Sequence, residues 1–367
     1  MSTSNRLISL DVLRGLTILL MILVNTPGSW AYVYPPLRHA DWHGCTPTDL
    51  VFPFFLFIVG VSAWFSFEKY NTKLSQPTFF KILKRALIIF LLGFLLNLYP
   101  FFDFDKVRVM GVLQRIALAY AFGAVICLSL NRKQLLIALG IIVLGYWALL
   151  YFGSALYPYT LEQNIVRKLD LLVFGDKHIY NGFGIPFDPE GLLSTIPSVA
   201  TVILGYLVGQ SISQHAEVLT KAKKLLVFGV CLSCLGYLWG FILPINKALW
   251  TSSYVLFTAG LGTIFLALLI FIIDIKGLLT WAKPFIHFGM NPLFIFVFSG
   301  LYVKTMSYLI HIPVQNEELS GYKYLYSQIF VPIAGNMNGS LLFAITHILM
   351  FWLICFLLFK NKVFIKI

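Results

Sequence analysis

The segment TSSYVLFTAGLGTIFLALLIFII, residues 251–273, contains no charged side chain. As a helix it would be about 35 Å long, enough to cross the ~30 Å hydrocarbon core of a bilayer. Similar apolar runs recur along the 367-residue chain, in which 59% of residues are hydrophobic and 11% are charged. A soluble domain carries roughly 25% charged residues, and the strands of a membrane β-barrel are only about ten residues long. The sequence therefore predicts an all-α polytopic membrane protein and excludes a water-soluble enzyme.

The apolar runs predict a bundle of about ten transmembrane helices with short, basic connections on one side and long, polar connections on the other. The predicted spans are 9–30, 48–68, 82–99, 109–130, 135–152, 191–212, 225–243, 251–273, 284–303 and 339–359. No internal repeat is evident, so we expect a single transmembrane domain over residues 1–367. An even number of spans places both termini on the same side.

The distribution of charge orients the predicted bundle. Of the 27 Lys and Arg residues, 17 fall on the side that holds both termini, together with only four acidic residues. The opposite side holds nine basic and eleven acidic residues. Because an excess of Lys and Arg marks cytoplasmic loops, we expect cytoplasmic termini in a multi-pass protein of the inner (plasma) membrane. The excess of basic residues that gives the net charge of +12 thus orients the protein in its bilayer, and we expect no nucleic-acid partner.

Polar residues within apolar spans are costly and are therefore candidates for function. Asp11 and Arg14 lie three residues apart, on one helical face near the start of the first span. They either neutralise each other or anchor an anionic ligand. Asn25 follows the apolar run of this span and precedes Pro27 and Gly28, so we expect the helix to break there. The Asn25 amide either caps or bridges helices or faces a site near the outer surface.

The stretch RHADWHGCTPTDL, residues 38–50, carries the densest set of reactive side chains. His39 is either a general base, because imidazole titrates near neutral pH, or an ordinary loop histidine. His39 and His43 have a spacing that can bind zinc, but the Glu of the H-E-x-x-H motif is missing and no third ligand is evident. We therefore expect no metal. Asp49 is a candidate helix cap and catalytic residue, and Trp42 a candidate for substrate binding.

Further polar residues occur in the fourth span and at the ends of later spans. Gln114 and Arg115 fall within the fourth span, where an arginine needs an ion-pair partner or a polar cavity. Its planar guanidinium also suits phosphate. Glu190 either binds substrate or complements the dipole of the helix that follows it. The remaining candidates for substrate binding are Asp188, Glu190, Asn246, Lys247 and Asn291.

Six segments together resemble the heparan-α-glucosaminide N-acetyltransferase family, in particular its bacterial members. In chain order they are RLISLDVLRG (6–15), HADWHGCTPTDLVFPFFLFIVG (39–60), GVLQRIALAY (111–120), DPEGLLSTIPSVATVILGYLVG (188–209), PINKALWTSSYVLFTAGLG (244–262) and FGMNPLFIFVFSGL (288–301). The resemblance runs from about residue 6 to about residue 305 and combines several rare strings. The interval from Asn25 to His39 is longer than in the animal enzyme.

Members of this family take acetyl-CoA from the cytosol and acetylate the amine of a terminal glucosamine on the far side of the membrane. The resemblance implies that His39, in its H-A-x-W-x-G context, is the active-site histidine, as general base or as carrier of the acetyl group. It also implies that Asn25 ends the first helix beside it. We expect acetyl-CoA to enter the bundle through a basic opening on the cytoplasmic side, near Asp11 and Arg14. Gln114 and Arg115 are expected to contact it deeper in the bundle. The expected partners are acetyl-CoA, an amino-sugar acceptor, the lipid bilayer and, in a homodimer, a second copy of the chain.

A sugar or anion transporter is the alternative function. Prolines at positions 27, 53, 197 and 292 indicate broken helices, and such helices form the substrate sites of many transporters. For an acetyltransferase, two routes stay open: direct attack by the amine, or transfer through an acetylated His39.

Overall fold

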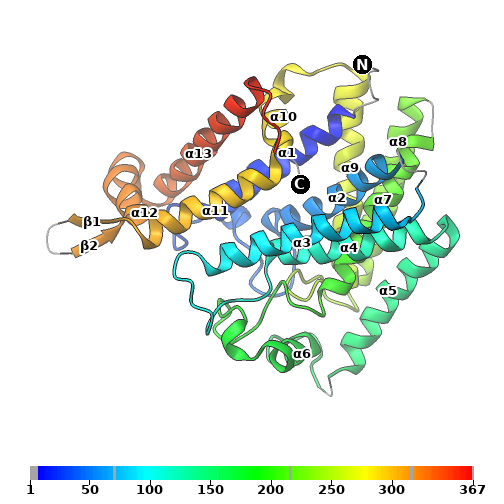
Figure 1. Cartoon of the computed structure of the whole chain (residues 1–367), viewed down its shortest axis with the longest axis horizontal. Helices are drawn as coiled ribbons and strands as arrows, with labels where there is room; N and C mark the ends of the chain where they lie inside the picture. Colours follow the sequence, from blue (N-terminus) through cyan, green and yellow to red (C-terminus); the bar gives the residue numbers. More distant parts are fainter. Residues whose placement is uncertain (1–6, 69–71, 155, 215–216, 315–316, 366–367) are drawn as a thin grey trace.

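The computed structural model describes residues 7–68, 72–154, 156–214, 217–314 and 317–365. Arg6, Lys69 and Lys366, which belong to the 17 basic residues counted above, lie outside these ranges. The described residues form a helical bundle with one short hairpin (Figure 1). The helices are α1 Ile8–Asn25, α2 Val51–Phe67, α3 Gln76–Leu98, α4 Val112–Ser129, α5 Arg132–Phe152, α6 Ile165–Phe174, α7 Thr195–Gln214, α8 Val218–Trp239, α9 Ser252–Leu269, α10 Lys283–Met290, α11 Pro292–Tyr308, α12 Gly321–Tyr324 and α13 Val331–Lys360.

Glycines allow neighbouring helices to pack with their backbones in close contact. Where α2 packs along α7, a Cβ atom on Gly60 would lie 2.0 Å from the carbonyl oxygen of Val202. On the facing helix, a Cβ atom on Gly205 would lie 2.1 Å from the carbonyl oxygen of Phe57. α1 approaches α10 equally closely at Gly15. Small residues at such contacts are typical of helices packed in a membrane, where the hydrophobic effect does not drive helices together.

Seven helices within the described ranges are long and apolar enough to cross a membrane, or eight if α10 and α11 count as one span. The predicted polytopic helical architecture is therefore confirmed. Each of the ten predicted spans overlaps a helix, but α3 and α8 are not among the seven, so the count of ten stays a prediction. α10 and α11 form an angle of 74° at Asn291, next to the predicted helix-breaking Pro292.

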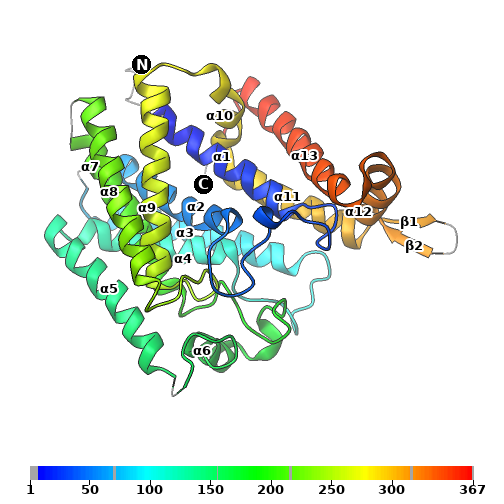
Figure 2. The same cartoon turned by 180° about the vertical axis from the view of Figure 1, so that it is seen from behind.

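The bundle has two unlike ends (Figures 1 and 2). The start of α1 and the end of α13 lie at one end, which we call the terminal end. The opposite end, which we call the loop end, carries α6 and the irregular connections. Strands β1 (His311–Val314) and β2 (Glu317–Ser320) form an antiparallel hairpin that projects from the body beside α12. The sequence predicted long polar connections in these regions but neither the strands nor α6.

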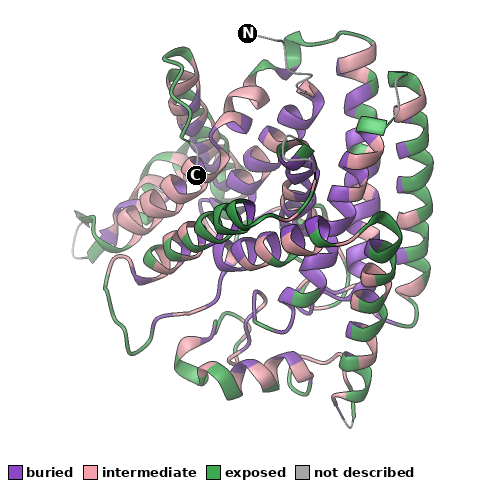
Figure 3. Ribbon diagram, turned by 45° about the vertical axis from the view of Figure 1, so that its right-hand side comes forward, coloured by how far each residue is buried: buried purple, intermediate pink, exposed green. Residues whose placement is uncertain are grey.

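The outer helices of the bundle carry many exposed residues (Figure 3). Many of these residues are large and apolar. On α3, Leu83, Leu87, Leu91 and Leu95 recur at every fourth position, and each is about half exposed. Residues four apart lie on the same face of a helix. A large apolar face exposed along the whole length of a helix would be unfavourable in water, so it indicates contact with lipid.

Candidate active site

His39 and Asp49 form a hydrogen-bonded pair at the loop end of the bundle. The distance between His39 Nδ1 and Asp49 Oδ1 is 2.6 Å. The Asp49 side chain is 1% exposed, whereas the His39 side chain is 42% exposed. A carboxylate that accepts a hydrogen bond from one ring nitrogen orients the imidazole and leaves the other nitrogen free to act as a base. This pairing therefore makes His39 Nε2 the candidate general base.

The local backbone fixes the position of the Asp49 carboxylate. Pro47–Leu50 forms a short 3-10 helix before α2, with Thr46 as its N-cap. Asp49 Oδ2 accepts hydrogen bonds from the backbone N–H groups of Ala40 and Thr46 and from the Thr46 hydroxyl, each at 3.0 Å. Asp49 thus has the predicted capping role and binds His39 through its other oxygen. Both carboxylate oxygens are used, which holds the pair in one orientation.

Lys247 lies beside this pair. Its Nζ is 3.5 Å from Asp49 Oδ1, 3.1 Å from His39 Nδ1 and 3.5 Å from His39 Nε2. Burial lowers the pKa of Lys247, while the carboxylates of Asp49 and Glu190 act in the opposite direction. Because His39 Nδ1 donates its proton to Asp49, it cannot also accept a hydrogen bond from the ammonium group. The ammonium group therefore sits at the edge of the imidazole, within reach of the Asp49 carboxylate.

A cavity of about 250 Å³, the outer cavity, opens beside these three residues at the loop end. Its lining combines charged side chains with aromatic rings. Residues that line it are His39, Asp41, Trp42, Asp49, Arg108, Tyr180, Phe183, Glu190 and Lys247. Five residues predicted for catalysis or substrate binding thus meet around one space, although they come from three separate segments of the chain.

A middle cavity of about 180 Å³ continues from the outer cavity toward the interior of the bundle. His39, Glu190 and Lys247 line both cavities, so these residues mark the junction between them. Asn25, the last residue of α1, lines the middle cavity with an exposed side chain. The structure thus brings Asn25 and His39 to the same cavity, as the sequence predicted.

An inner cavity of about 330 Å³ shares Phe55 and Leu293 with the middle cavity. Arg14 and Arg85 line it near the terminal end. Arg14 donates a hydrogen bond of 3.0 Å to Asp11, so the predicted pair forms while the Arg14 side chain also borders the cavity. The shared lining residues place the three cavities in series, from Arg14 at the terminal end to the junction at the loop end.

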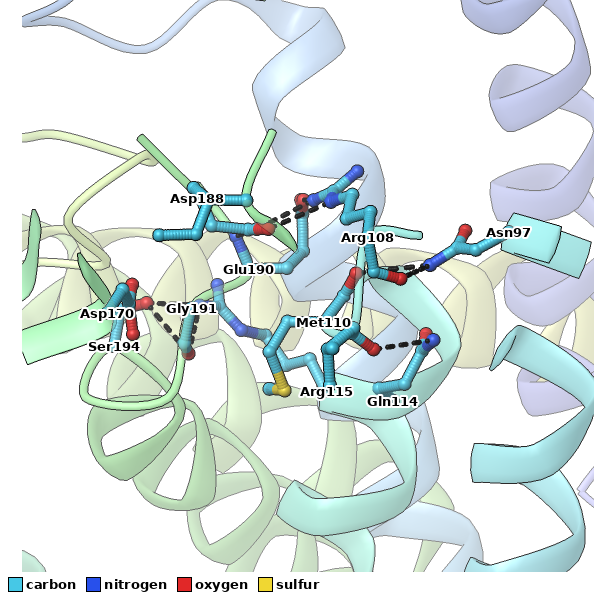
Figure 4. A network of polar contacts seen from close by, with 12 residues as sticks. Asn97, Arg108, Met110, Gln114, Arg115, Asp170, Asp188, Glu190, Gly191 and Ser194 are labelled. Carbon is cyan, nitrogen blue, oxygen red and sulfur yellow. Dashed lines mark hydrogen bonds and ion pairs between the residues drawn. The ribbon is translucent and has the colours of Figure 1, made fainter. Parts of the chain in front are cut away.

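Arg108 binds both acidic residues that the sequence suggested for substrate binding (Figure 4). Its guanidinium donates two hydrogen bonds to Asp188, at 2.9 and 2.7 Å, and one to Glu190, at 2.5 Å. Burial alone would lower the pKa of Arg108, but the carboxylates of Glu190 and Asp188 raise it above its usual value. Asp188 is 1% exposed and lines none of the three cavities, whereas Glu190 lines two of them. Glu190 is thus the acid that a ligand can reach.

Gln114 and Arg115, near the start of α4, bind backbone carbonyl groups of the loops at this end of the bundle (Figure 4). Gln114 donates a hydrogen bond to a backbone carbonyl in the loop before α4. Arg115 is fully buried, donates to the carbonyl oxygen of Gly191 at 3.2 Å and lies 5.0 Å from the ring centre of Trp250. Neither residue lines the inner, middle or outer cavity as the structure describes them. The structure therefore does not bring them to Arg14, with which the sequence grouped them for acetyl-CoA binding.

Asn246 and Asn291 bind backbone groups. Asn246 is buried in the loop between α8 and α9, and its Nδ2 donates to the carbonyl oxygen of Trp42 at 2.8 Å. Asn291 Nδ2 donates to the carbonyl oxygen of Val363, and Asn291 Oδ1 accepts a hydrogen bond from the backbone N–H of Ile365. These contacts place Asn291 beside the chain that follows α13, at the terminal end. The structure thus separates Asn291 from the outer cavity, for which the sequence proposed it.

Trp42 and His43 follow His39 closely in sequence but have different surroundings. The Trp42 indole donates to the carbonyl oxygen of Tyr159 at 2.7 Å, and its ring packs edge-on against Phe187. His43 Nδ1 lies 3.3 Å from Asn246 Nδ2, and burial lowers its pKa. The two histidines of the zinc hypothesis therefore bind different partners. Across the described parts of the chain, no three His, Cys, Asp or Glu side chains form a group that could hold a metal ion.

The sequence analysis missed Arg108, Tyr180 and Phe183, all of which line the outer cavity. The sequence could have predicted the ion pairs of Arg108, because an arginine at the boundary of a predicted span needs an acidic partner. The DPE segment at 188–190 offers two acidic residues. Tyr180 and Phe183 lie in an irregular connection with no hydrophobic period, so nothing in the sequence singled them out.

Comparisons with known proteins match this chain to characterised acetyltransferases. The model for the catalytic region of heparan-alpha-glucosaminide N-acetyltransferase matches residues 6–239. The chain is 29% identical to heparan-alpha-glucosaminide N-acetyltransferase of Homo sapiens over 356 residues, covering 80% of this chain and 52% of the relative. The protein of the same name from Mus musculus is 30% identical over 359 residues, covering 81% and 53%. The chain thus spans about half the length of the curated relatives it matches. Lys247 lies beyond the residues that the family model matches.

Proposed function

Because the chain belongs to the heparan-alpha-glucosaminide N-acetyltransferase family, we propose that it transfers acetyl from acetyl-CoA to the amine of a glucosamine-like sugar across a membrane. One observation carries this proposal: the His39–Asp49 pair lies where the outer and middle cavities meet. An acyl donor that enters from the terminal end and an amine that enters from the loop end would meet beside a base.

Acetyl-CoA enters from the terminal end in this proposal. Its charged nucleotide stays out of the hydrocarbon region, where charge is costly. The basic side chains of Arg14 and Arg85 border the mouth of the inner cavity and suit its phosphates. The uncharged pantetheine arm extends through the inner and middle cavities toward His39. With the excess of basic residues at this end, the ten-span arrangement then has both termini in the cytoplasm and the protein in the inner membrane.

His39 acts as the general base for the amine. As the amine nitrogen bonds to the thioester carbonyl carbon, His39 Nε2 takes the proton from that nitrogen, and Asp49 stabilises the imidazolium that forms. The carbon–sulfur bond then breaks, and the CoA thiolate takes the proton from His39. The products are an N-acetylated sugar and free CoA. Asn25, which lines the middle cavity, is placed to donate its amide to the acetyl oxygen.

The acceptor occupies the outer cavity. The rings of Trp42, Tyr180 and Phe183 offer apolar surface against which a sugar ring can pack. The carboxylates of Asp41 and Glu190 suit hydroxyl groups and an ammonium group. A space of about 250 Å³ suits one small sugar, which supports an amino-sugar acceptor rather than a lipid or a protein.

Replacing Glu190 with Gln should raise the KM for glucosamine strongly, because the carboxylate that reaches the outer cavity loses its charge. Asp188→Asn is the matched control, since Asp188 binds the same Arg108 but lines none of the three cavities. It should lower thermal stability and leave the KM nearly unchanged. Initial rates against glucosamine concentration, with thermal melts of both variants, test this. Equal KM values for Glu190→Gln and wild type would leave Glu190 only a structural role.

The direct test of the proposed activity uses purified protein in detergent, with acetyl-CoA and a panel of amino sugars, followed by mass spectrometry. We expect N-acetylglucosamine and free CoA in equal amounts. A sugar or anion transporter is the second candidate, favoured by the 74° bend between α10 and α11 and by the three cavities in series. Glucosamine flux into vesicles without acetyl-CoA, together with no acetylated product in detergent, would support the transporter instead.

A further inference from the structure

Lys247 is a positive charge at the junction of the outer and middle cavities, and the mechanism above gives it no task. Its Nζ lies within 3.5 Å of both ring nitrogens of His39 and of Asp49 Oδ1. The Asp49 carboxylate already accepts hydrogen bonds from His39, Ala40 and Thr46. The Lys247 ammonium group is therefore not required to satisfy the hydrogen-bonding capacity of Asp49, which points to another use for this lysine.

The loop that carries Lys247 is firmly held. The preceding residue, Asn246, binds the carbonyl oxygen of Trp42 through Nδ2 and the backbone N–H of Leu249 through Oδ1. The backbone N–H of Gly44 donates to the carbonyl oxygen of Ile245 at 2.7 Å. These bonds join the Lys247 loop to the segment that carries His39. The ammonium group is thus preorganised relative to the base, as electrostatic catalysis requires.

The charged and titratable groups that face this junction are few, so the effect of Lys247 on His39 can be isolated. Those that line the outer or middle cavity with His39 are Asp41, Asp49, Arg108, Tyr180, Glu190 and Lys247. The Cys45 thiol also interacts with Lys247 and Asp49. Arg108 is already neutralised by its bonds to Asp188 and Glu190. Arg108 lines only the outer cavity, whereas Lys247 lines both cavities and lies beside His39, so Lys247 is the cation placed next to the base.

We propose that the Lys247 ammonium group stabilises the negative charge that develops on the acetyl oxygen during transfer. This role rests on the proposed function and deepens it. When the amine nitrogen bonds to the thioester carbon, the carbonyl π electrons move to oxygen, and Lys247 donates a hydrogen bond to that oxyanion. The carbonyl re-forms as the carbon–sulfur bond breaks, and the proton moves from the amine through His39 to sulfur. Lys247 itself stays protonated throughout, and a charged donor is stronger here than the neutral amide of Asn25.

A second consequence concerns His39. The Lys247 ammonium group lies beside the His39 ring, and a positive charge next to an imidazole opposes protonation of that ring. Removing the charge should therefore move the pH dependence of reactions at His39 to higher pH. This effect is independent of substrate and can be measured without an activity assay.

The test compares Lys247→Gln with Lys247→Arg, which keeps the charge. Lys247→Gln should lower kcat by roughly 10²–10³-fold, leave acetyl-CoA affinity nearly unchanged and move the acidic limb of the kcat/KM profile to higher pH. Lys247→Arg should recover part of kcat and should return the acidic limb of the kcat/KM profile to its wild-type position. Lys177→Gln is the matched control, because Lys177 is exposed in the loop that follows α6 and lines none of the three cavities. Lys247→Met provides a second neutral variant if the Gln variant folds poorly.

The activity-independent readout is the pH dependence of His39 modification by diethyl pyrocarbonate, followed by peptide mass spectrometry. The reactive form is neutral imidazole, so the pH profile of the modification should move to higher pH in Lys247→Gln and not in Lys247→Arg. Undiminished kcat in a folded Lys247→Gln protein, or an Arg variant no better than Gln, would overturn the role of Lys247. Absence of acetyl transfer by wild-type protein would instead overturn the proposed function, and the role of Lys247 with it.

Discussion

Replacing His39 with Ala should reduce acetyl transfer by roughly 10²–10⁴-fold while acetyl-CoA still binds. The expected loss is large because Ala removes the group that, in the proposed mechanism, takes the proton from the amine and returns it to sulfur. Binding should persist, because in the proposed arrangement the nucleotide binds at the terminal end near Arg14, and the middle cavity lies between that site and His39. Initial rates in detergent and titration calorimetry with acetyl-CoA measure the two quantities separately.

His43→Ala is the matched control for this experiment. His43 lies four residues away and contacts Asn246 rather than Asp49, so its loss should change the rate much less. If both variants lost activity equally, or if chelators abolished activity, the zinc hypothesis would regain support. Incubation of wild-type protein with acetyl-CoA alone adds a further result: an acetyl group trapped on His39 would favour the two-step route over direct attack.

Asp49→Asn should have a comparable effect, approaching 10⁴-fold, as for the aspartate that orients the histidine of a catalytic triad. Asp49 Oδ2 accepts hydrogen bonds from two backbone N–H groups, so the carbonyl oxygen of the Asn side chain should take that position. The amide NH₂ group then faces His39 Nδ1 and makes that nitrogen an acceptor. The proton must move to Nε2, which can no longer act as the base.

Asp41→Asn is the control for Asp49→Asn, because it removes an acid from the lining of the same cavity. It should affect the KM for the sugar more than kcat. The effects of His39→Ala and Asp49→Asn on the rate of transfer should not be additive, since each mutation disables the same pair. Transfer by a folded Asp49→Asn protein within tenfold of wild type would show that the carboxylate only caps the helix.

The fold was predictable to the extent that composition and periodicity determine it. Apolar runs such as residues 251–273 must cross lipid or be buried, and the structure has helices at each predicted span. The β1–β2 hairpin was not predictable in this way, because four-residue strands give no clear period. α6 lies in a long polar connection, and its ten residues are too short to read as a span.

The candidate site was predictable residue by residue but not as an assembly. His39 and Asp49 were each identified from a reactive segment, yet their pairing depends on an irregular loop whose path has no sequence pattern. Lys247 reaches His39 from a loop more than 200 residues later. Asn291 shows the converse limit: its Asn-Pro context predicted a break correctly, but the sequence could not tell that its amide binds the backbone of Val363 at the terminal end.

In the proposed reaction, acetyl passes from one side of the membrane to an amine on the other side at His39. Sealed vesicles that contain the purified protein in a single orientation, loaded with glucosamine and given acetyl-CoA only outside, test it most directly. When Arg14 and the terminal end face outward, N-acetylglucosamine should accumulate inside the vesicles and free CoA outside, and His39→Ala vesicles should form neither. Product found only outside, or no product in vesicles whose solubilised protein is active, would contradict transfer across the membrane.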